Sequence, residues 1–133
     1  MVAALAQRSL RLSRLKVYFD GGLRPEGMET AVVIRGEAHV RRDLGPGTSM
    51  DAEWLALLHA VALTRAIGWD AVVLIGDSAA VVAQANGVVR ARGGDARHHA
   101  AFVEATAGQG PRVRYVKRAQ NLAGGALARL HER

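Results

Sequence analysis

The sequence predicts an α/β domain built on a mixed sheet. A short strand at 15–20 is followed by two more strand-like segments before any helix, and helices and strands alternate only afterwards. A long apolar helix is predicted at about 51–67. The uninterrupted apolar run at 71–75 is typical of a central strand covered on both faces. Early strands followed by interleaved helices indicate helices packed on a mixed sheet.

Length and composition are those of a single globular domain. The 133 residues are half hydrophobic and 23% charged, which is enough for one core. The chain has no cysteine, which excludes a disulfide framework, a zinc–thiolate site and a thiol nucleophile. We therefore expect a cytoplasmic protein. No apolar run approaches the ~20 residues of a membrane-spanning helix, so we expect no membrane partner.

The net charge of +6 favours polyanionic partners, nucleic acid above all. The alternative is a soluble protein with a high arginine background. Arg8, Arg11 and Arg14 follow one another at three-residue spacing, so residues 1–14 are predicted to be a basic N-terminal extension. The domain itself is predicted to occupy 15–133.

The first strand, 15–20, alternates polar and apolar residues and ends in a carboxylate. Gly21 and Gly22 are predicted to turn the chain at once. The segments 30–34 and 38–44 then form an antiparallel hairpin that continues the sheet.

The long helix at 51–67 has a clear predicted start. Thr48 and Asp51 have the spacing of a capping box. The helix is apolar almost all round and is therefore mostly buried. Glu53 begins a face that otherwise packs on the sheet, and a carboxylate there needs a partner or a cation.

The second half of the chain alternates between helix and strand. Asp77 follows the apolar run, and Ser78 is placed to cap the next helix. The predicted elements are a helix at 79–85, a helix at 97–107, a strand at 112–116 and a helix at 121–131.

Three acids stand at the ends of predicted elements: Asp20, Glu53 and Asp77. Sites in open α/β sheets form at the carboxyl ends of strands, and neighbouring strands lie ~5 Å apart. Taken singly, each acid is explained as a helix cap or a solvated turn. Together, three converging carboxylates repel one another unless protonated or bridged by metal, and oxygen ligands suit Mg²⁺ or Mn²⁺.

Four segments carry a resemblance to a known family: YFDGG at 18–22, AEWLALLHAV at 52–61, DSAAVVAQANG at 77–87 and RAQNLAGGALA at 118–128. They resemble the ribonuclease H family, specifically its compact bacterial, reverse-transcriptase-like single-domain branch. The resemblance implies a ribonuclease H-like fold, with a five-stranded mixed sheet and helices on both faces.

The resemblance also implies a function and a site. Asp20, Glu53 and Asp77 match three of the family's four metal-binding carboxylates, which hold Mg²⁺ or Mn²⁺. The activity that the resemblance implies is cleavage of the RNA strand of an RNA/DNA hybrid. The residues that the resemblance places against the nucleic acid are Gly21, Gly22, Ser49, Ser78 and Asn121.

Several positions depart from the family pattern. The fourth aspartate falls on Gly125, and Glu132, seven residues on, is a poor substitute. Met50 stands where the family often has an asparagine that contacts nucleic acid. His98 and His99 are interpreted as surface residues rather than as the mobile histidine of many members.

The departures leave two main hypotheses open. The first is a metal-dependent endonuclease acting on RNA/DNA hybrids, weakened by the missing acid. The alternative is a catalytically impaired module that binds nucleic acid, or a protein partner, through the same fold. A different nuclease of the same superfold is a third reading. No G-x-G-x-x-G follows the first strand, which argues against a Rossmann-type nucleotide site.

Overall fold

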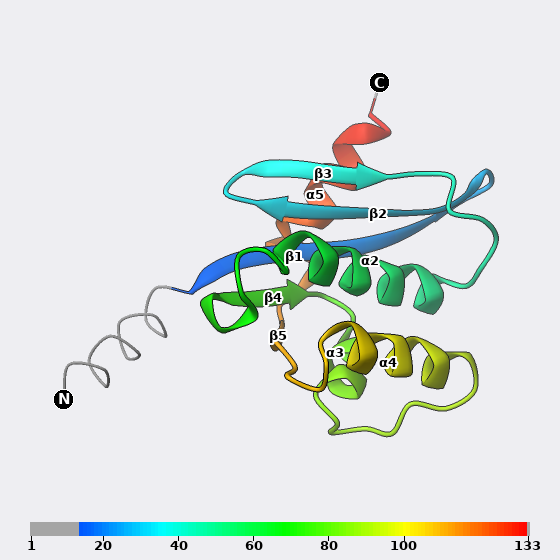
Figure 1. Cartoon of the computed structure of the whole chain (residues 1–133). Helices are drawn as coiled ribbons and strands as arrows, with labels where there is room; N and C mark the ends of the chain where they lie inside the picture. Colours follow the sequence, from blue (N-terminus) through cyan, green and yellow to red (C-terminus); the bar gives the residue numbers. More distant parts are fainter. Residues whose placement is uncertain (1–13, 133) are drawn as a thin grey trace.

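In the computed structural model, which describes residues 14–132, a five-stranded mixed sheet has the order β3-β2-β1-β4-β5 (Figure 1). The strands are β1 (Leu15–Arg24), β2 (Gly27–Ile34), β3 (Glu37–Arg41), β4 (Val72–Gly76) and β5 (Arg112–Tyr115). The pairs β1–β2 and β2–β3 are antiparallel, and β1–β4 and β4–β5 are parallel. The predicted ribonuclease H-like fold is confirmed. The predicted basic extension lies outside the described residues, apart from Arg14.

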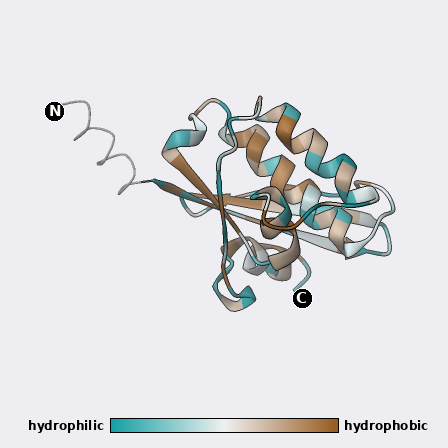
Figure 2. Cartoon of the chain, turned by 90° about the horizontal axis from the view of Figure 1, so that it is seen from below, coloured by the Kyte–Doolittle hydropathy of each residue, from teal (hydrophilic) through white to brown (hydrophobic). Residues whose placement is uncertain are grey.

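Helices cover both faces of the sheet. They are α2 (Ser49–Thr64), α3 (Ala79–Ala85), α4 (Gly94–Ala105) and α5 (Leu122–Leu130), with two 3₁₀ turns, η1 (Trp69–Ala71) and η2 (Arg118–Gln120). Helices α2, α3 and α4 share one core with side chains such as Val17 and Leu74, whereas α5 packs on Ala31 and Val33 from the other side. Figure 2 shows hydrophobic residues gathered in the sheet and on the helix sides that meet it.

The first strand does not end at Asp20, as the glycines had suggested. β1 continues through Gly21 and Gly22 to Arg24, and the turn comes only after it. The strand stays extended because β2 pairs with it all the way to Gly27. On its other side, the pairing with β4 ends at Tyr18. Beyond that point β1 has an open edge, and the site is built there.

The predicted start of α2 is confirmed. The Thr48 side chain accepts from the Asp51 amide at 3.0 Å, and the Asp51 carboxylate accepts from the Thr48 amide at 2.9 Å. The helix ends at Thr64 rather than at residue 67. The other predicted boundaries differ from the observed ones by at most three residues.

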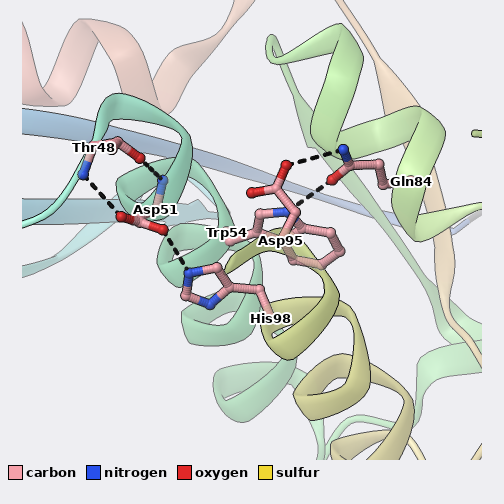
Figure 3. A network of polar contacts seen from close by, with 6 residues as sticks. All are labelled: Thr48, Asp51, Trp54, Gln84, Asp95 and His98. Atoms are coloured by element: carbon pink, nitrogen blue, oxygen red, sulfur yellow. Dashed lines mark hydrogen bonds and ion pairs between the residues drawn. The ribbon is translucent and has the colours of Figure 1, made fainter. Parts of the chain in front are cut away.

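A polar network fastens α4 to the first turns of α2 and to α3 (Figure 3). His98 of α4 meets the Asp51 carboxylate at 2.9 Å and stacks on Trp54. The Trp54 indole N–H donates to the Gln84 side chain at 3.0 Å, and the Gln84 amide donates to Asp95 at 3.1 Å. His98 is 22% exposed and is held by these contacts, so it is half-buried rather than free on the surface.

A buried acid holds the C-terminal end of α5. Glu29 of β2 is 3% exposed, and its carboxylate meets the ring of His131 at 2.8 Å, just after the helix ends. Arg24 and Arg42 lie 3.7 and 3.8 Å from the same carboxylate. This cluster fixes the C-terminal end of α5 on the sheet and thereby sets where its first turn lies. Within residues 14–132, no helix is long and apolar enough to cross a membrane.

A buried histidine between α2 and the sheet makes stability depend on pH. His59 is 3% exposed, and its ring meets the Thr30 hydroxyl at 2.9 Å. Burial lowers its pKa to about 4, with further contributions from Arg41 and His39. The folded state therefore resists protonation between pH 6.5 and 4, and stability is lost as the pH falls through that window.

We predict that His59→Gln reduces the loss of unfolding free energy as the pH falls from 6.5 to 4, because glutamine can still pair with Thr30 but does not titrate. The pKa shift corresponds to at most about 3 kcal/mol of unfolding free energy. Urea unfolding of both proteins at pH 7.0, 5.5 and 4.5 measures the effect. Equal losses of unfolding free energy in the two proteins would refute the assignment.

Candidate metal centre

The three predicted acids come together where β4 ends beside β1. Tyr18 pairs with Ile75, so two further residues along each parallel strand bring Asp20 beside Asp77. Glu53, at the start of the second turn of α2, reaches the same point. One carboxylate oxygen from each acid lies within 4.8 Å of the other two. Among the described residues this is the group of acids and histidines that is able to hold a metal ion.

A glycine permits the close approach of α2. A Cβ atom at Gly21 would collide with the carbonyl of Ala52 in the first turn of the helix. Without it, the Gly21 amide donates to Glu53 Oε1 at 2.7 Å, which holds that carboxylate over the open edge of β1. The glycine is therefore needed for a contact between strand and helix rather than for a turn.

Burial and mutual repulsion keep protons on this cluster. Burial raises the pKa of Asp20, and the charge of Asp77 adds to the rise. Burial, together with the neighbouring Asp20, raises the pKa of Glu53 to about 9. The second oxygen of Glu53, Oε2, is buried without a hydrogen-bond partner. An oxygen-only cluster with one unpartnered buried oxygen fits a hard divalent cation such as Mg²⁺ or Mn²⁺.

Asn121 ties the remaining acid to α5. Its side-chain amide donates to Asp77 Oδ2 at 3.1 Å and to the Phe19 carbonyl at 3.0 Å. Its oxygen accepts from the Ala123 amide at 3.0 Å and so caps α5. One buried side chain thus aligns a carboxylate, a strand and a helix. Ser78, as predicted, caps α3 by accepting from the Val81 amide at 3.3 Å.

An open cleft of about 700 Å³ lies in front of the acids. Its lining comprises Asp20, Gly21, Ser49, Met50, Glu53, Asp77, Ser78, Arg118, Ala119, Asn121, Gly124, Gly125 and Ala128. All the residues predicted to contact nucleic acid except Gly22 line it. Gly22 instead faces Glu29, whose Cγ would lie 3.3 Å from an added Cβ. Contacts of the five predicted residues with nucleic acid remain predictions.

Two lining residues were not singled out from the sequence. Arg118 of η2 lies in the cleft, and its charge favours the ionised form of Asp20, against the larger effect of burial. Gly124 lies closer to the acids than Gly125 does, since an added Cβ at Gly124 would lie 3.2 Å from Asp20 Oδ2. Both lie in the segment 118–128 that carries part of the family resemblance. Their position beside the acids depends on how η2 and α5 return to the sheet, which that pattern does not contain.

The position of the missing fourth acid is open. A Cβ added at Gly125 would have one close neighbour, Arg129 Nη1 at 3.3 Å. Glu132, predicted to be a poor substitute, follows the end of α5 and does not belong to the group of acids. The described part of the chain therefore offers three carboxylates here, with space for a fourth at Gly125.

The raised pKa values predict that metal binding releases protons. At pH 7.5 we expect binding of Mn²⁺ to displace about one proton, mainly from Glu53, because the cation competes with the proton that burial retains. Calorimetric titration in two buffers of different ionisation enthalpy measures the number. Glu53→Gln is expected to remove the proton release, and an unchanged release in that variant would contradict the assignment.

A family model matches most of the chain. The model of a family described as reverse transcriptase-like matches residues 30–131, a range that includes Glu53 and Asp77 and begins after Asp20. A search of curated proteins gave no match.

Solved structures match over most of the chain. LC11-RNase H1, isolated from compost by a metagenomic approach, is 26% identical, with a TM-score of 0.69, over 86% of this chain and 92% of that one. RNase H1 from the halophilic archaeon Halobacterium salinarum NRC-1 is 27% identical, with a TM-score of 0.67, over 86% and 93%. LC11-RNase H1 in complex with an RNA/DNA hybrid matches at 20% identity, with a TM-score of 0.65, over 86% and 93%.

Proposed function

This chain belongs to the reverse transcriptase-like family, and we propose that it is a metal-dependent endonuclease that hydrolyses the RNA strand of RNA/DNA hybrids. The observation that carries the proposal is the carboxylate cluster. Asp20, Glu53 and Asp77 come from three separate elements and converge within 4.8 Å at an open cleft. LC11-RNase H1, which matches at 26% identity, has also been solved in complex with an RNA/DNA hybrid, and this supports the hybrid as substrate.

We assign the residues of the cleft different roles according to their chemistry. Asp20, Glu53 and Asp77 would together hold a divalent cation, each through a carboxylate oxygen. A divalent ion held there supplies charge stabilisation to the attacking and leaving oxygens of a phosphodiester. Arg118 faces the same cleft and offers a cation to a substrate phosphate. The hybrid would be recognised through phosphates, groove shape and 2′-hydroxyls rather than base sequence.

The fold and the acids are also compatible with a module that binds nucleic acid without cutting it. Gly125 removes one anionic ligand, and Met50 in the cleft lining lacks the amide expected there. Retention of the other three acids favours the enzyme. Buried carboxylates that repel one another destabilise a protein that has no cation to bind, and a pure binder gains nothing from them.

We predict metal-dependent cleavage of an end-labelled RNA/DNA hybrid by the purified protein. Mn²⁺ is expected to support faster cleavage than Mg²⁺, because it binds such ligands more tightly and better tolerates a missing one. Asp20→Asn is expected to abolish the cleavage. The assay also includes the RNA strand alone and a DNA duplex. Binding of the hybrid without cleavage in either metal would favour the binding module.

Restoring an acid at residue 125 separates a weakened enzyme from a binder. We predict that Gly125→Asp raises the cleavage rate in Mg²⁺ and narrows the gap between Mg²⁺ and Mn²⁺. The site has room for the side chain, and an aspartate near the start of α5 is favourable to the helix.

Gly125→Asn is the matched control for that experiment, because it adds the same volume without the charge. Arg129 lies 3.3 Å from the added Cβ and would pair with an aspartate, so Gly125→Asp/Arg129→Ala is measured as well. Equal rates for the wild type and both aspartate variants would count against a site that lacks only its fourth carboxylate.

A further inference from the structure

In the described part of the chain, the face of the sheet on which α5 packs has a hollow beside the first turn of that helix. The hollow has a volume of about 480 Å³, and its lining includes Lys16, Tyr18, Arg35 and Leu122. Leu122, on α5, is 51% exposed, and Tyr18 packs against the small core beneath the helix. The hollow thus has an apolar side formed by Tyr18 and Leu122, with cations around it.

Strand register adds another cation to this face. Tyr18, Ile75 and Arg114 form one row across β1, β4 and β5, so their side chains share a face. Val113 lies in the core beneath α2, which puts its neighbour Arg114 on the opposite side, the side of the hollow. We call Lys16, Tyr18, Arg35, Arg114 and Leu122 the basic sheet face.

No cation of the basic sheet face forms an ion pair within the described residues. Across residues 14–132, ion pairs form instead at Arg24, Arg42, His98 and His131. Lys16, Arg35 and Arg114 are all exposed. Clustered like charges of this kind raise the local positive potential and attract polyanions.

We propose that the basic sheet face binds a single strand of nucleic acid, at a site separate from the acidic cleft. Grooves for single strands combine cations that follow the phosphates with aromatic surface against which bases stack. Lys16, Arg35 and Arg114 supply the first feature, and Tyr18 supplies the second. The chain's own segment 1–13 is a poor occupant, because it contains Arg8 and Arg11 and no acid.

The position of this face relates it to the cleft. Lys16, Tyr18 and Asp20 lie on the same side of β1 in successive steps of about 7 Å. Leu122 borders the hollow, and its neighbour Asn121 lines the cleft, so the two sites flank the first turn of α5. A single-stranded extension bound on the basic sheet face would continue toward a duplex held at the acids. The binding itself does not depend on catalysis.

The test measures binding of a 5′-fluorescein-labelled uridine 20-mer by fluorescence anisotropy in EDTA, so that no metal ion in the acidic cleft attracts the strand. The test variant is Lys16→Gln/Arg114→Gln. The control variant is Arg41→Gln/Arg65→Gln, which removes the same charge from elsewhere. Arg41 lies opposite Thr30 in the strand register, and the Thr30 hydroxyl meets His59 of α2, so Arg41 is on the α2 side of the sheet. Arg65 directly follows α2. Thermal unfolding of both variants establishes that they are folded.

We expect the test variant to bind more weakly than the control variant and the wild type. The slope of log K against log salt should fall by roughly 1.4, about 0.7 for each lost phosphate contact on a single strand. Asp20→Asn should bind the 20-mer as well as or better than the wild type. Equal affinities and salt slopes in the two double variants would overturn the proposal. Equal competition by a duplex of the same length would overturn the assignment to a single strand. Absence of hybrid cleavage would refute the proposed function but would leave the affinity for the 20-mer and its salt dependence unchanged.

Discussion

The contact between the Gly21 amide and the Glu53 carboxylate is the constraint on which the site depends. It joins an extended strand to the first two turns of a helix that begins almost thirty residues later, and only a residue without a Cβ fits between them. The capping box at Thr48 and the packing of Trp54 fix these turns from the other side. The strand edge is exposed there because β4 stops pairing with β1 after Tyr18.

The acids that this contact gathers oppose folding unless they hold protons or a cation. Folding raises the pKa of Glu53 from 4.5 to about 9, so the metal-free site is most favourable at low pH and loses stability as the pH rises between these two values. His59 acts in the opposite direction, because it loses stability as the pH falls below its ordinary pKa. A cation bound by Asp20, Glu53 and Asp77 would replace the protons and relieve the repulsion. Stability and metal occupancy are therefore coupled in this fold.

The two glycines of α5 leave space beside the acids where side chains would otherwise stand. Gly124 leaves Asp20 Oδ2 without a side chain against it, and Gly125 leaves a gap beside Arg129. Helical glycines are unfavourable by about 1 kcal/mol each relative to alanine. Asn121 at one end of the helix, and the Glu29–His131 pair at the other, hold it in place despite them. The helix is thus positioned by its two ends, and its middle opens onto the cleft.

The sequence by itself determined the elements whose signals are local. The capping box at Thr48, the apolar run of β4 and the cap at Ser78 were predicted, because each depends on residues within a few positions of one another. The positions of the three acids at the ends of predicted elements singled them out, and the family resemblance then implied that they bind metal. The tertiary structure alone decided what Gly21 does, since a glycine required for close approach has the same one-letter signal as a glycine in a turn. It also decided that His98 is packed on Trp54 and that Arg118 faces the acids, because each contact joins residues that are distant in the chain and are brought together only by the sheet order.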